Sequence, residues 1–69
     1  TMGVAYIVKL LQKYKPKRIM EVGMNAGSFS IIAKLTLGDV KVYTVDRVWE
    51  FTERAKQINE FFGENLISN

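Results

Sequence analysis

Two short strand-like segments alternate with three longer helical segments, and this alternation restricts the fold more than any other feature. The strand-like segments, 18–22 and 41–45, are rich in β-branched and other apolar residues. Strands that alternate with helices are typical of parallel pairing through right-handed crossovers. The sequence therefore predicts an α/β fold in the order helix, strand, helix, strand, helix, with 65–68 beginning a third strand.

The three helical segments, 3–14, 29–37 and 48–62, each carry one apolar stripe. In the first segment the apolar residues recur at i, i+3, i+4 and i+7. The stripes are formed by Val4, Ile7, Val8 and Leu11; by Phe29, Ile32, Ala33 and Leu37; and by Phe51, Ala55, Ile58 and Phe62. Pro16, Gly38 and Gly63 follow the three segments and are expected to end the helices.

The chain has 69 residues with neither cysteine nor histidine, so it has few means of stabilising so small a sheet. Disulfides are excluded, and structural zinc lacks its usual ligands. Parallel strands are normally covered on both faces, and we expect 18–22 to be a buried strand. A two-stranded sheet is marginal in water. We therefore expect an incomplete sheet whose edge is completed by another copy, a swapped copy or further sequence of a parent protein.

The composition is that of a globular protein, with 48% hydrophobic and 25% charged residues. No apolar run approaches the ~20 residues that a membrane span needs, so we expect no membrane association. The absence of cysteine favours a reducing compartment, and the expected location is cytoplasmic.

Positive charge is concentrated at the beginning of the chain. The formal net charge is +3, and residues 1–20 contain five cations and no acid. The cations are Lys9, Lys13, Lys15, Lys17 and Arg18. Such a segment is typical of a solvated helix face, and weak contact with nucleic acid through residues 9–18 is the alternative interpretation.

The residues that carry chemistry lie where the first strand ends. Glu21-Val22-Gly23-Met24-Asn25-Ala26-Gly27 joins that strand to the second helix. Gly23 allows a sharp turn and the close approach of a ligand, and Asn25 tolerates a left-handed backbone. Because ligands of open parallel sheets bind at the carboxyl ends of the strands, this loop is the predicted binding site.

Asp46 ends the second strand, 23 residues after Gly23. An acid about 20 residues beyond a glycine-rich loop is typical of nucleotide sites, where it hydrogen-bonds a ribose hydroxyl. Ser28 stands where the dinucleotide fingerprint has its third glycine. The charge of Glu21 also disfavours a pyrophosphate and favours a ligand with ammonium and sulfonium groups, so electrostatics prefer S-adenosylmethionine over NAD.

At these residues the chain resembles the N-terminal portion of class I (Rossmann-like) S-adenosylmethionine-dependent methyltransferases. The family's first motif, an acid followed by spaced Gly, Gly or Asn, and Gly, is matched by E-V-G-M-N-A-G, and its second by Asp46. The resemblance implies that the cofactor is bound by seven residues: Glu21, Gly23, Met24, Asn25, Gly27, Asp46 and Arg47. It further implies a partial Rossmann-like three-layer unit, with 1–16 as a leading helix and linker and 17–69 as the cofactor-binding unit.

The predicted function is the cofactor-binding portion of a methyltransferase with an unknown acceptor. Family members have about seven strands, so the 69-residue chain alone is not expected to be active, and it offers no catalytic residue or metal ligand. Two alternatives stay open at this point. One is a fragment of a Rossmann-like enzyme that uses NAD or a nucleotide sugar. The other is a non-catalytic association or RNA-binding module.

Overall fold

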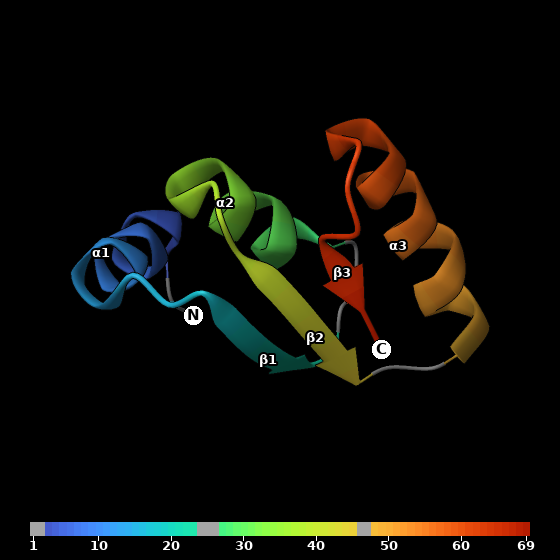
Figure 1. The fold of residues 1–69 in the computed structure, drawn as a ribbon. Helices are drawn as coiled ribbons and strands as arrows, with labels where there is room; N and C mark the ends of the chain where they lie inside the picture. Colours follow the sequence, from blue (N-terminus) through green and yellow to red (C-terminus); the bar gives the residue numbers. More distant parts are fainter. Residues whose placement is uncertain (1–2, 24–26, 46–47) are drawn as a thin grey trace.

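The structure is a computed structural model that describes residues 3–23, 27–45 and 48–69, and only the backbone of residues 48–52. It contains three helices and three strands in alternation (Figure 1). They are α1 (Val4–Tyr14), β1 (Arg18–Val22), α2 (Ser28–Leu37), β2 (Lys41–Val45), α3 (Val48–Phe62) and β3 (Ile67–Ser68). The predicted order of elements is confirmed, including the third strand.

The three strands form one parallel sheet in the order β1-β2-β3. In the register of β1 and β2, Glu21 lies beside Thr44 and Val22 beside Val45. All three helices lie on the same side of this sheet (Figure 1). Because the strands are parallel, the carboxyl ends of β1 and β2 meet at one edge, and the loop that follows β1 begins there.

The hydrophobic core lies between this sheet and the helices. It consists of Leu11, Ala33, Val40, Val42, Ala55, Ile58, Leu66 and Ile67, all of them buried. Leu11, Ala33, Ala55 and Ile58 belong to the apolar stripes of the three helices. Burial of these stripes against the sheet contributes to stability through the hydrophobic effect. None of the helices that the structure describes combines the length and apolar character that a membrane crossing requires.

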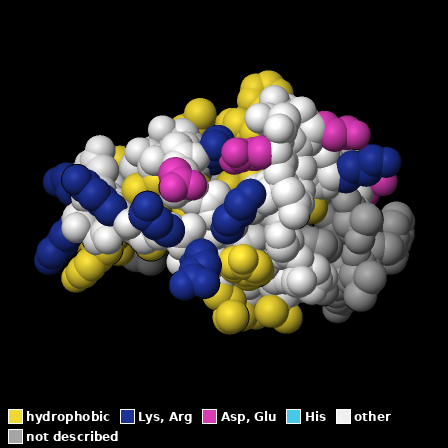
Figure 2. Space-filling view, in the orientation of Figure 1, with side chains coloured by type: hydrophobic (Ala, Val, Ile, Leu, Met, Phe, Trp, Pro, Cys, Tyr) yellow, Lys and Arg dark blue, Asp and Glu magenta, His cyan; other side chains and the backbone are white. Residues whose placement is uncertain are grey.

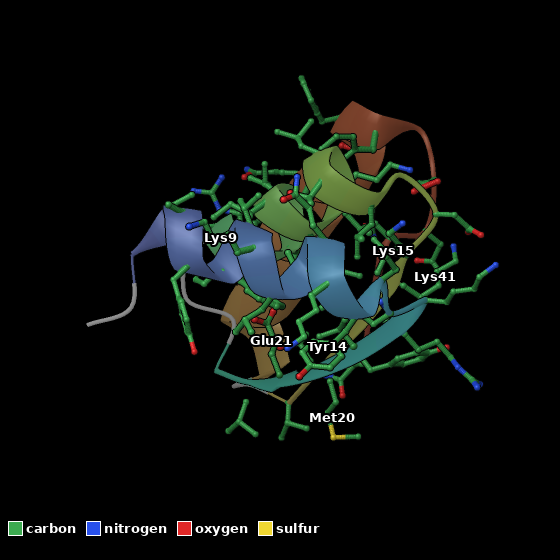
Figure 3. All side chains as sticks on the ribbon, turned by 90° about the vertical axis from the view of Figure 1, so that its left-hand side faces the viewer. Lys9, Tyr14, Lys15, Met20, Glu21 and Lys41 are labelled. Atoms are coloured by element: carbon green, nitrogen blue, oxygen red, sulfur yellow. The ribbon has the colours of Figure 1, made fainter. Side chains whose placement is uncertain are left out.

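The opposite face of the sheet is bare and largely apolar. Met20 and Val22 of β1 are 74% and 84% exposed, and their register partners Tyr43 and Val45 are 41% and 57% exposed. Figure 2 shows hydrophobic side chains along the lower side of the molecule, and Figure 3 shows Met20 projecting below the sheet. The prediction of a buried β1 strand is therefore wrong for this face. The physical reason is that all three helices pack on one side.

The end of α1 shows how the proline acts. Lys15 follows the helix with a left-handed φ of 46°, and its N–H donates to the carbonyl of Leu11 at 2.8 Å. A left-handed residue is a common helix ending, although one other than glycine is strained there. Since Pro16 disfavours the α region for the residue before it, Lys15 leaves the helix at this point and directs the chain into β1.

The outer edge of β3 is closed by one side chain of α3. The N–H of Ile67 donates to Asn59 Oδ1 at 2.8 Å, and Asn59 Nδ2 donates to the Ile67 carbonyl at 3.0 Å. The carbonyl of Leu66 accepts from Val42 of β2 at 2.9 Å, so the polar groups of Ile67 are directed to the opposite edge. Asn59 therefore takes the place that a further strand would occupy. Among the described residues β1 has no such cover on its outer side.

Replacing Asn59 with alanine is expected to lower the free energy of unfolding by about 2 kcal/mol. The change leaves the N–H and the carbonyl of Ile67 without their partners, and each such loss costs about 1 kcal/mol. Urea unfolding followed by circular dichroism measures the effect. Gln57→Ala, an exposed position on the same helix, is the control and should stay within about 0.5 kcal/mol. Equal stability of the two variants would show that the Asn59 bonds do not hold β3.

Candidate functional site

The candidate site begins where β1 and β2 end side by side. The N–H of Gly23 donates to the carbonyl of Val45 at 2.8 Å. This bond joins the first residue after β1 to the last residue of β2, which Asp46 follows directly in the sequence. The glycine loop and the start of the segment that contains Asp46 therefore leave the sheet at the same edge.

Two glycines give the loop its backbone conformation. Gly23 has a φ of 79° and Gly27 a φ of 82°, both in the left-handed region that side chains disfavour. A Cβ at Gly23 would meet no atom within 4 Å, so glycine is required there by the backbone rather than by crowding. Gly27 is buried and is the N-cap of α2, and its carbonyl accepts from Ile31 at 3.1 Å.

The seven residues expected to bind the cofactor are only partly described. Glu21, Gly23 and Gly27 lie along the path from β1 to α2. Four others lie outside the described residues: Met24, Asn25, Asp46 and Arg47. The roles given to all seven stay predictions. Of the described residues, Glu21 brings a carboxylate to this loop, and the first turn of α2 contains no acidic residue.

Glu21 lies on the inner face of the sheet and is half-buried. In Figure 3 it is on the helix side of β1, whereas Met20 is on the other side. Ser30, in the first turn of α2, donates from Oγ to Glu21 Oε1 at 3.3 Å. The amides at the start of a helix carry partial positive charge. A carboxylate at this position is suited to meet a cationic group of a ligand.

Two buried hydroxyls next to Glu21 were not predicted as part of the site. Ser30 has no exposed surface and Thr44, the register partner of Glu21, is 1% exposed. Thr44 is two residues after Val42 and therefore lies on the same face of the strand. This alternation is the sequence signal that could have identified Thr44 as buried. Nothing in the helical stripe of α2 marked Ser30, because its inward direction depends on how α2 packs against β1.

The described residues of this arrangement offer groups that can bind a ligand. Within the described parts of the chain no group of three or more Asp, Glu, His or Cys side chains is placed to hold a metal ion. The site offers a carboxylate for a cation, a turn that allows close approach, and helix amides for polar groups. These features suit a ligand with a cationic group.

Comparison with known proteins relates the chain to methyltransferases. It is 30% identical over 66 residues to the protein-L-isoaspartate O-methyltransferase of Ignicoccus hospitalis, covering 94% of this chain and 31% of that protein. It also matches the crystal structure of a protein assigned as a caffeoyl-CoA O-methyltransferase from Staphylococcus aureus. That match has a TM-score of 0.75 and 26% identity, and it covers 93% of this chain and 31% of the other. No protein-family model matches the chain.

These similarities confirm the resemblance drawn from the loop and Asp46. Over nearly its whole length the chain carries part of the class I, Rossmann-like methyltransferase fold. It spans about a third of the length of each of these two proteins. A fragment of an NAD or nucleotide-sugar enzyme and a non-catalytic module are not favoured by these matches.

Thr44 provides a test of how the buried hydroxyls near Glu21 affect stability. Its Oγ1 is buried and has no hydrogen-bond partner among the described residues, and an unsatisfied buried hydroxyl costs about 1 kcal/mol or more. Thr44→Val keeps the shape of the side chain and is expected to raise the free energy of unfolding by about 1 kcal/mol in urea titrations. Thr36→Val, at a half-buried position of α2, is the control. A clear loss of stability in Thr44→Val would show that this hydroxyl is satisfied in solution.

Proposed function

We propose that the chain is the S-adenosylmethionine-binding portion of a methyltransferase. The observation that carries the proposal is the junction of β1 and β2, where the Gly23–Val45 hydrogen bond brings the glycine loop to the strand that precedes Asp46. The similarity to two proteins named as methyltransferases supports it. The reaction would be attack of an acceptor nucleophile on the sulfonium methyl, and the acceptor would be bound by residues outside this chain.

Each predicted cofactor residue has a part in this proposal. Glu21 faces the ammonium of the methionine end, and Gly23, Met24, Asn25 and Gly27 form the loop against that end. Asp46 accepts hydrogen bonds from both ribose hydroxyls, and Arg47 lies toward the adenine. Residues 17–69 form the cofactor-binding unit, preceded by a leading helix and linker in 1–16. The protein's contribution to catalysis is positioning and electrostatics.

A cytoplasmic location is part of the same proposal, supported by the absence of cysteine. The basic residues of the first segment lie on and beside α1, where Figure 2 shows several Lys and Arg side chains together. Lys17 is paired with Asp39 at 3.7 Å, and both side chains are largely exposed, so the pair contributes little. Contact of this segment with nucleic acid stays a prediction.

Replacing Asp46 with alanine is expected to weaken binding of S-adenosylhomocysteine at least tenfold, because two hydrogen bonds to the ribose are lost. Isothermal titration calorimetry measures this on the protein encoded by the natural reading frame that contains the sequence. Asp39→Ala removes an exposed acid from the opposite end of β2 and is the matched control. The proposal is wrong if the unmodified protein does not bind, or if Asp46→Ala binds as tightly as the control.

The bare sheet face leads to a second part of the proposal, which concerns association. Because Asn59 closes the outer edge at β3, we place the expected completion of the sheet at β1 and over the exposed face. A second copy or the rest of a parent protein would cover Met20, Val22 and Val45 there. Exposed apolar surface of this kind is typical of an interface.

Charged residues on this face should therefore oppose self-association of the 69-residue chain. Val22→Glu with Val45→Lys is expected to shift sedimentation-velocity profiles from associated species toward monomer, without loss of helical circular dichroism. Leu35→Lys, at a position 73% exposed on α2, is the control for added charge away from the sheet. A compact monomer of the unmodified chain that unfolds cooperatively would contradict association through this face.

A further inference from the structure

A basic surface lies at the end of the sheet opposite to the glycine loop. It is formed by exposed cations from the last turn of α1, the segment that follows it and the starts of β1 and β2. They are Lys13, Lys15, Lys17, Arg18 and Lys41. Figure 2 shows Lys and Arg side chains together on this part of the molecule, and in Figure 3 Lys15 and Lys41 lie at the same end of the sheet. Cations that are far apart in the sequence therefore form one surface.

Backbone hydrogen bonds hold these residues together. The N–H of Lys41 donates to the carbonyl of Lys17 at 2.9 Å, and Arg18 is the register partner of Lys41. Lys15 ends α1 in a left-handed conformation, and Pro16 then leads the chain into β1. The position of the basic surface is therefore fixed by the parallel sheet and by the way in which α1 ends.

The charge of the basic surface is largely uncompensated. Among the described residues, only Lys17 of this group is ion-paired, with Asp39 at 3.7 Å, and the two side chains are 81% and 88% exposed. So exposed a pair contributes little. Lys41 donates from Nζ to the carbonyl of Asn65 at 2.9 Å, and a carbonyl carries no net charge. A concentration of positive charge of this kind attracts an anionic partner.

The arrangement of the cations favours an extended polyanion over a single phosphate. A single phosphate is commonly bound by backbone N–H groups that converge at the start of a helix. Here α1 presents its carboxyl end to the basic surface, and the partial charge of that end is negative. The cations are instead distributed over a helix, a connecting segment and two strands. A nucleic acid backbone, which carries a charge on every nucleotide, matches such a distribution.

Tyr14 favours a single strand as the form of nucleic acid. It is 68% exposed and lies between Lys13 and Lys15 in the sequence, and Lys13 Nζ is 5.2 Å from the centroid of its ring. Proteins bind single strands with cations that follow the backbone and with aromatic rings on which bases stack. A duplex or an acidic peptide would use the cations, but neither offers an unpaired base to the ring.

We propose that the basic surface binds single-stranded RNA through its phosphate backbone, with one base stacked on Tyr14. The inference goes beyond the proposed function, because this surface is separate from the glycine loop. β1 has five residues, so about 16 Å separates its two ends. RNA held at the amino ends of the strands leaves the cofactor loop free, and the two ligands bind independently.

The cations are tested by fluorescence anisotropy on the natural full-length protein, with a labelled single strand of about 12 uridine nucleotides. Lys13→Gln with Lys15→Gln is expected to weaken binding about tenfold at low salt. It should also reduce the slope of log K against log salt by about 1.4, since each phosphate contact contributes about 0.7. Arg54→Gln with Lys56→Gln removes two exposed cations from α3 and is the matched control. Equal effects of the two double variants would show a response to net charge alone and overturn the proposal.

The role of Tyr14 is tested separately. Tyr14→Leu keeps an apolar side chain and removes the aromatic ring. It is expected to weaken the single strand about tenfold, because base stacking on the ring is lost, and to leave binding of an RNA duplex of the same length unchanged. Circular dichroism establishes that the variant is folded. No loss, or an equal loss for both forms of RNA, would contradict a single-strand surface.

S-adenosylhomocysteine distinguishes this inference from the proposed function. The Lys13 and Lys15 double variant should bind it as tightly as the unmodified protein does, and saturating S-adenosylhomocysteine should leave the affinity for RNA unchanged. Competition between the two ligands would place the RNA at the glycine loop and contradict the basic surface. If the unmodified protein binds RNA but not S-adenosylhomocysteine, only the proposed function fails. If it binds S-adenosylhomocysteine but not RNA, only this inference fails.

Discussion

The parallel pairing of β1 with β2 is the constraint on which the rest of the structure depends. It requires a crossover between the two strands, and α2 is that crossover. It also places both strand ends at one edge, where the N–H of Gly23 reaches the carbonyl of Val45. Gly23, the first residue of the loop, and Val45, the last residue of β2, meet because of this pairing. If the two strands were antiparallel, their carboxyl ends, and with them Glu21 and Asp46, would be at opposite edges of the sheet.

The sheet is asymmetric in both its faces and its edges. One face carries the core and the polar group of Glu21, Ser30 and Thr44, while the other is exposed. One edge is closed by Asn59 and the other, at β1, is open among the described residues. The closed edge and the helix-covered face need no further part of the protein to cover them. The open edge and the bare face have the character of an interface, consistent with a chain that spans about a third of its matches.

Local patterns were sufficient to predict the elements, because their signals are themselves local. The helical stripes, Pro16, Gly38 and Gly63 gave bounds that agree with the structure within about one residue. The exposure of Met20 and Val22 was not predicted, because an apolar strand does not indicate which of its faces a helix will cover. The closure of β3 by Asn59 was missed for a related reason, since it depends on how α3 approaches that strand.

The sequence by itself determined the order of the elements and predicted a binding site at the end of the first strand. The pattern of an acid, spaced glycines and a second acid 23 residues beyond Gly23 is visible in the sequence alone. It does not depend on how the helices and strands pack. Only the tertiary structure decided which residues lie beside Glu21, because Ser30 bonds to it from α2 and Thr44 is its register partner on β2. It also decided that all the helices cover one face. This one-sided arrangement depends on the direction of the crossovers, which bring α2 and α3 to the same side of the sheet.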